Sequence, residues 1–224
     1  MATGAITALI QTQSSIEQGL PVAITQTFTG TTRVTPNVTC PVAIQGELTT
    51  RTNDTDGIVT AAAHGIAGPV GTTPAVDFIG LYWVDPTDGV TDKFAYGCTI
   101  TAADTNTITF EATGGDVLPA ATAGTTAGTT VYICVGQRVT NITLPADTGT
   151  EMFQITTTLD NGYCVLMSAG SVVELATFVT LDVPYIWPLI AGADSPLDAS
   201  ITVMDFYGTD TASTLEVKLD AVLE

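Results

Sequence analysis

The sequence predicts an all-β protein, an antiparallel, jelly-roll-like β-sandwich with a small β-barrel-like subdomain in the middle of the chain. Three observations favour this class. Thr is the commonest residue, and Thr, Val and Ile suit pleated, half-buried surfaces better than helices. Apolar and polar residues alternate along most of the chain. The 21 glycines and 11 prolines separate the alternating runs, as in sandwiches and barrels.

Alternating runs recur along nearly the whole chain and mark the expected strands. Clear examples, in order, lie at residues 21–29, 107–112, 130–136, 150–158, 201–208 and 214–223. In the last run the odd positions from Leu215 to Leu219 are apolar and the positions between them are charged, so one face of the strand should be wet. Asp160-Asn161-Gly162 predicts a tight hairpin, because Asn-Gly supplies the positive φ angles of a type I′ turn.

Three parts of the chain differ in pattern. Residues 1–20 are too weakly patterned to fold alone and are expected to form an N-terminal arm. Residues 21–52 and 138–224 should form the main β-sandwich. Residues 53–137 carry most of the long loops and are predicted to be the inserted small β subdomain.

The net charge of the chain limits the classes of partner that we expect. There are 23 Asp and Glu residues against 5 Lys and Arg, a net charge of −18. Nucleic acid is therefore not an expected partner, because neutralising phosphates requires clustered Lys and Arg. Charged residues make up only 12% of the chain, so much of the surface should consist of small and hydroxyl residues that can pack against copies of itself. We expect neither a signal peptide nor a membrane contact, since basic and long apolar stretches are missing.

Catalysis and metal binding have few candidates. His64 is the one histidine, so a Ser-His-Asp or Cys-His site would need it. No GxSxG or phosphate-binding loop occurs, and we expect no catalytic residue, cofactor or metal. His64 is predicted to lie in the turn that ends the 57–63 strand, its ring bonded to backbone and Gly65 supplying the permissive φ. A carboxylate pair from two strands stays an open alternative.

The acidic turns and the cysteines are expected to be structural. Residues 53–57 and 85–89 predict turns in which Asp and Asn bond their own backbone, with a structural Ca²⁺ as the alternative. The cysteines are widely spaced, and each sits in an apolar or alternating run, which favours free, buried thiols over a disulfide or zinc. They are Cys40, Cys98, Cys134 and Cys164.

Two aromatic groups are candidate interface residues. Tyr82 and Trp83 lie in the middle segment, and Tyr185 and Trp187 lie in the sequence PYIWP. Core packing is the alternative for both groups. The PYIWP segment is the better candidate, because its prolines favour an extended segment that cannot sit centrally in a sheet.

The middle segment also carries a family resemblance. GIVTAAAHGIAG, then VDF, an aromatic strand and TAADTNTITFEA resemble a module of tailed-bacteriophage virion proteins. The matching positions are Ala63, His64, Gly65, Val76, Phe78, Tyr96, Asp104, Asn106, Thr107 and Phe110. The sequence PVGTTP after Gly68 departs from the family, which has a shorter Gly-Asp turn. Residues 194–223 are similar to the closing hairpin of small phage β-sandwich proteins.

The resemblance implies a structural role in a virus particle and no catalytic residues. The expected function is a capsid decoration protein, made in the host cytoplasm and placed on the capsid exterior of the virion. Its implied partners are the major capsid protein and copies of itself, as a homotrimer. A tail tube, baseplate or fibre subunit is the first alternative. A glycan-binding adhesion module is the alternative from another class, and an enzyme using His64 is the third.

Overall fold

A computed structural model describes residues 3–11, 22–29, 37–66, 75–120, 128–140, 150–157, 162–168, 172–179, 185–190 and 201–223. These residues form strands β1 to β17 and no helix, and the strand pairs whose register is described are antiparallel. The all-β, antiparallel class is confirmed. Within the described residues there is accordingly no helix that could cross a membrane.

The chain folds into two compact units. The two-sheet unit comprises Met1–Cys40, Gln137–Phe206 and Ser213–Glu224, and the barrel unit comprises Pro41–Gly136 and Tyr207–Ala212. The barrel unit thus consists of two chain segments, the long middle segment Pro41–Gly136 and the short segment Tyr207–Ala212. Each unit has its own strand pairing and is described separately.

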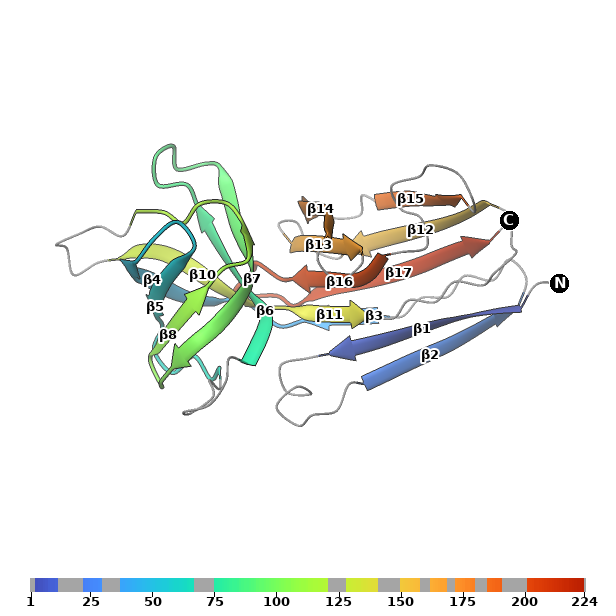
Figure 1. Ribbon diagram of the computed structural model, residues 1–224, viewed down its shortest axis with the longest axis horizontal. Coiled ribbons are helices and arrows are strands. Elements are labelled where there is room, and N and C mark those ends of the chain that lie inside the picture. Colours follow the sequence, from blue (N-terminus) through green and yellow to red (C-terminus); the bar gives the residue numbers. More distant parts are fainter. Residues whose placement is uncertain are drawn as a thin grey trace. The chain divides into compact units, whose positions relative to one another are not determined.

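The barrel unit is a closed sheet (Figure 1). Its strand order is β6-β10-β4-β5-β8-β7, and β6 also pairs with β7, while the short β9 pairs with β7. Closure removes the free sheet edges. The strands are β4 (Ile44–Arg51), β5 (Asp56–Thr60), β6 (Ala75–Val84), β7 (Asp92–Ala103), β8 (Thr107–Glu111), β9 (Gly114–Gly115) and β10 (Thr129–Val135).

The interior of the barrel is filled by alternate apolar side chains of these strands. On β10, Val131 and Ile133 are fully buried, whereas Thr130, which precedes Val131, is exposed. Side chains from β4, β5, β6, β7 and β8 complete the core, among them Leu48, Trp83 and Ile100. Burial of this apolar surface is the main stabilising contribution to the unit.

The two-sheet unit is a sandwich. A six-stranded sheet has the order β14-β13-β16-β11-β1-β2, and a four-stranded sheet has the order β15-β12-β17-β3. The sheets contact each other, because the Cys40 thiol of β3 donates to the carbonyl oxygen of Phe206 on β16 at 3.3 Å. The strands are β1 (Thr3–Gln11), β2 (Val22–Thr29), β3 (Asn37–Cys40), β11 (Gln137–Thr140), β12 (Thr150–Thr157), β13 (Gly162–Ser168), β14 (Val172–Val179), β15 (Tyr185–Ile190), β16 (Ile201–Tyr207) and β17 (Leu215–Leu223).

The N-terminal segment differs from the predicted arm. Residues Thr3–Gln11 form β1, which pairs with β2 on one side and with β11 on the other. The weak alternation of this segment did not indicate a strand. β1 is held in the sheet by backbone hydrogen bonds to β2, which is near in the sequence, and to β11, which is far away.

The start of the barrel unit also differs from the predicted boundary. The unit begins at Pro41 rather than at residue 53, while its first pass ends at Gly136, one residue before the predicted end. Residues 41–52 belong to the barrel because β4 pairs with β5 and β10. Alternation shows that β4 is a strand but carries no information about which sheet it joins.

The predicted hairpin at Asp160-Asn161-Gly162 is wrong. β12 pairs with β15 and β17, whereas β13 lies in the six-stranded sheet, so the two strands that would flank the hairpin are not paired with each other. Asp160 and Asn161 themselves lie outside the described residues. Gly162 is closely packed, because a Cβ at this position would lie 2.8 Å from Val179 Cγ2 and 2.9 Å from Leu215 Cδ2, so these side chains would have to shift. A glycine needed for close packing gives the same sequence signal as one needed for a turn.

The closing hairpin implied at residues 194–223 is likewise absent from the described strands. β16 pairs with β11 in the six-stranded sheet, and β17 pairs with β12 and β3 in the four-stranded sheet. Between them Tyr207–Ala212 belong to the barrel unit, where the ring of Tyr207 lies 5.2 Å from that of Phe94. The predicted wet face of β17 is confirmed where side chains are described, since Leu215 and Val217 are buried and Glu216 is exposed.

The cysteines are free and buried, as predicted. Burial raises the pKa of the Cys40 and Cys98 thiols well above the usual range and that of Cys164 to about 12. A thiol that stays protonated is a poor nucleophile and a poor metal ligand. The cysteines therefore act as small apolar core residues.

Candidate functional site

His64 lies in a tight turn after β5. Its Nδ1 accepts a hydrogen bond from the backbone N–H of Ile66 at 3.1 Å, and the residue is 6% exposed. Gly65 has φ +67°, and Ala63 before the histidine has φ +50°, a region that L side chains rarely adopt. The prediction of a turn residue bonded to backbone is confirmed, and Nδ1 is not free to accept a proton from a nucleophile in this arrangement.

The two parts of the phage-like motif meet at this turn. The backbone N–H of Ala63 donates to Asn106 Oδ1 at 3.3 Å, and the N–H of Ala61 donates to the Asn106 carbonyl oxygen at 2.8 Å. Asp104 holds the second turn, because its Oδ1 accepts from the N–H groups of Asn106 and Thr107, both at 2.7 Å. These bonds lower the pKa of the Asp104 carboxyl, with the bond from the Asn106 backbone as the largest cause.

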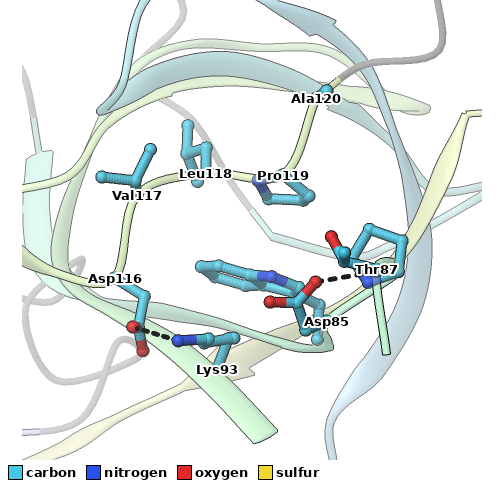
Figure 2. Close-up of a pocket in the computed structure, with 10 residues that line it drawn as sticks. Asp85, Thr87, Lys93, Asp116, Val117, Leu118, Pro119 and Ala120 are labelled. Carbon is cyan, nitrogen blue, oxygen red and sulfur yellow. Dashed lines mark hydrogen bonds and ion pairs between the residues drawn. The ribbon is translucent and has the colours of Figure 1, made fainter. Parts of the chain in front are cut away.

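The described part of the barrel unit also contains a pocket of about 410 Å³. Figure 2 shows the Val117–Pro119 segment along one side of it and Asp85, Lys93 and Asp116 along the other. The full lining is Trp83, Asp85, Pro86, Thr87, Lys93, Asp116, Val117, Leu118, Pro119 and Ala120. No pattern in the sequence indicated this pocket. One part of its wall is the β6–β7 loop, with Asp85 to Thr87, and another part is the segment from Asp116 to Ala120, which follows β9.

Polar contacts fix the charged residues of the pocket. Lys93 Nζ lies 3.1 Å from Asp116 Oδ1, and Asp116 Oδ2 accepts from the backbone N–H of Phe94 at 3.1 Å. The hydrogen bond with Asp116 is the main cause of a raised Lys93 pKa, and the charges of Asp85 and Asp88 raise it further. Asp85 Oδ1 accepts from the N–H of Thr87 at 2.8 Å. The lining therefore carries a paired Lys93 and an additional negative charge at Asp85.

Asp88 organises the hairpin loop that borders the pocket. Its carboxylate accepts hydrogen bonds from the Thr91 hydroxyl and from the backbone N–H groups of Val90 and Thr91, the latter two at 2.9 Å. The bond from the Thr91 hydroxyl is the largest cause that lowers the Asp88 pKa to about 2. This loop is the predicted acidic turn at residues 85–89, and its Asp side chains bond local backbone as expected.

Asp88 should make stability depend on pH at the acid end. A carboxyl whose pKa is lower in the folded state than in the unfolded chain stabilises the fold above the unfolded value of about 4, and this is lost as pH falls toward 2. The destabilisation caused by Asp88→Ala should therefore be largest near neutral pH and shrink through this window. Urea titrations of both proteins between pH 7 and pH 2 measure it, and a difference independent of pH would contradict the assignment.

The other acidic turn also holds itself together. Asn53 Oδ1 accepts from the N–H groups of Thr55 and Asp56 at 2.7 and 2.8 Å. Asp54 forms an ion pair with Arg51. Among the residues the structure describes, no group of three or more His, Cys, Asp or Glu side chains is arranged to hold a metal ion.

The four aromatic residues predicted to lie at an interface occupy different environments in the structure. Trp83 is 2% exposed and belongs to the barrel core, so the interface prediction for it is corrected to a core role. Tyr82 is half-buried on the other face of β6, donates to Asp92 Oδ1 at 2.8 Å and stacks 5.4 Å from Tyr132. Burial and the bond to Asp92 raise the Tyr82 pKa. Partner contact by Tyr82 stays a prediction.

Tyr185 and Trp187 lie on β15, opposite Ile155 and Phe153 of β12. β15 is one of the two edge strands of the four-stranded sheet, which agrees with the expectation that a proline-containing strand avoids the centre of a sheet. The side chains of Tyr185 and Trp187 lie outside the described part of the structure, and their role as interface residues stays a prediction.

Comparisons with known proteins give no match. No protein-family model, no curated protein and no solved structure matches the chain.

Proposed function

We propose that the protein is a structural component of a tailed-phage particle that decorates and stabilises the outer capsid surface. One observation carries the proposal. The Ala-His-Gly turn and the Asp104-to-Thr107 turn, which carry the phage-like resemblance, are joined by the hydrogen bonds between Ala63, Ala61 and Asn106. The two short segments that resemble the phage module are therefore in contact in the barrel unit, where hydrogen bonds join them.

The open sheets of the other unit support self-association. In the strand order of the described residues, β14 and β2 end the six-stranded sheet and β15 and β3 end the four-stranded sheet. The outer strand of an open sheet presents backbone groups that can pair with another chain. The protein thus combines a closed module with a unit whose edges suit contacts with copies of itself and with a shell.

The net charge of −18 supports a position outside the shell. A strongly anionic protein is repelled by packaged nucleic acid and is attracted to basic surface patches. A position outside the shell would put the contacts of this protein on the major capsid protein and on its own copies, and the family resemblance implies a homotrimer.

Labelling of virus particles tests this proposal. An antibody against the full chain, applied to particles purified from the virus that encodes it, should mark the heads in many copies, and native mass measurement of the free protein should give a trimer. Labelling of tails with a hexameric mass would favour the tail alternative. Absence from particles together with saturable glycan binding would favour the adhesion alternative, and either result overturns the proposal.

A further inference from the structure

The pocket of the barrel unit has the size of a site for a small organic group. Its volume of about 410 Å³ lies within the range of about 300–1,000 Å³ that is usual for ligand pockets. Its walls combine prolines Pro86 and Pro119 with carboxylates and the core residue Trp83. An occupant should therefore have both an apolar part and a charged or polar end.

The charges around the pocket favour a cation. Asp85 and Asp116 line it and Asp88 lies on the adjoining loop, against Lys93 as the one cation of the lining. Lys93 is already paired with Asp116. Asp85 uses Oδ1 to accept from Thr87, and within the described residues no hydrogen bond to its Oδ2 is present. One carboxylate oxygen in the lining is thus open to a donor from outside.

Exposed apolar side chains lie at the same end of the barrel. Val117 lines the pocket and is 59% exposed, while Val90 on the β6–β7 loop is 78% exposed. Val84, at the end of β6, is 37% exposed and lies opposite Asp92. A protein that covers the pocket would have this apolar surface to bury beside it.

We infer that this pocket receives an arginine side chain from a different protein. The guanidinium would pair with Asp85 and the aliphatic stem would lie between Pro86 and Pro119. Arginine suits the pocket better than lysine because its planar head can bond a carboxylate through two N–H groups while its stem stays in apolar contact.

A second copy of the chain is a poor source of this arginine. The chain has only five basic residues, and Arg51, Lys93 and Arg138 are already paired with carboxylates of their own chain. The partner we infer is a basic segment of the shell protein. Its identity rests on the proposed function.

A short peptide measures the binding directly on the full-length protein. The probe is acetyl-Gly-Arg-Gly-amide, and its match is the same peptide with uncharged citrulline in place of arginine. The readout is the NMR signal of the Trp83 indole N–H, assigned with a Trp187→Phe variant because the chain has two tryptophans. The arginine peptide should shift this signal saturably, with weaker binding at higher salt, and the citrulline peptide should not saturate it.

Asp85→Asn is the deciding variant, because Asn keeps an oxygen to accept from Thr87 and removes only the charge. It should weaken arginine-peptide binding about tenfold at unchanged thermal stability. Glu111→Gln, the matched loss of one charge on β8 opposite Thr99, should leave binding unchanged. Equal binding of both peptides, no saturable shift, or an unaltered affinity in Asp85→Asn would overturn the inference. Head labelling of particles is independent of these outcomes, so the two proposals fail separately.

Discussion

Replacing Arg138 with Met is expected to lower the free energy of unfolding by about 3–5 kcal/mol, because it leaves a buried carboxylate without its cation. Asp205 is 2% exposed. Its two oxygens accept from Nε and Nη2 of Arg138 at 2.6 and 2.8 Å. The residues lie directly opposite each other on β11 and β16, two interior strands of the six-stranded sheet. Urea unfolding followed by circular dichroism measures the loss.

Two controls separate the buried charge from the loss of arginine itself. Arg51→Met removes an arginine whose partner Asp54 is 72% exposed, and it should cost no more than about 1 kcal/mol. Arg138→Met combined with Asp205→Leu removes both charges and should recover most of the stability. A loss in Arg138→Met no larger than in Arg51→Met would contradict the assignment.

Replacing Trp83 with Ala is expected to lower the free energy of unfolding by about 3–5 kcal/mol, because it opens a cavity in the barrel core. Trp83 is among the largest buried side chains of the described residues and packs in the cluster that contains Leu81 and Ile133. The surrounding strands belong to a closed sheet, which limits how far they can collapse into the space. The same urea titration applies.

The control for this prediction is Val90→Ala. Val90 is an apolar residue of the neighbouring loop but is 78% exposed, so its truncation should change stability by no more than about 0.5 kcal/mol. A small loss in Trp83→Ala, similar to that in Val90→Ala, would show that the Trp83 ring is not part of the stabilising core.

Local pattern predicted several of the strands and the turn around His64. Alternation identified β8, β10, β16 and β17 to within a few residues, because one face of each strand is buried and the other is not. The turn was predictable because Gly65 and the histidine ring supply their own backbone geometry within a few residues. The burial of the cysteines followed from the apolar character of their runs in the same way.

Features that depend on distant partners were not predictable. The pocket brings together Asp116, beside β9, and Lys93, near the start of β7. The Arg138–Asp205 pair joins strands that are far apart in the sequence. Neither residue pair has a local signature, since each charged residue taken alone resembles a solvated surface residue.

Alternation, charge and turn chemistry act within a few residues, so the all-β class, the anionic character of the protein and the local turns can be read from the sequence. The placement of β12 and β13 in different sheets, the burial of Trp83 in the core and the position of Asp85 in a pocket emerge only when the chain folds. Strand pairing is made through backbone groups, which are nearly the same in every residue. Side chains fix which face of a strand is buried, and the packing of the whole unit fixes its neighbour.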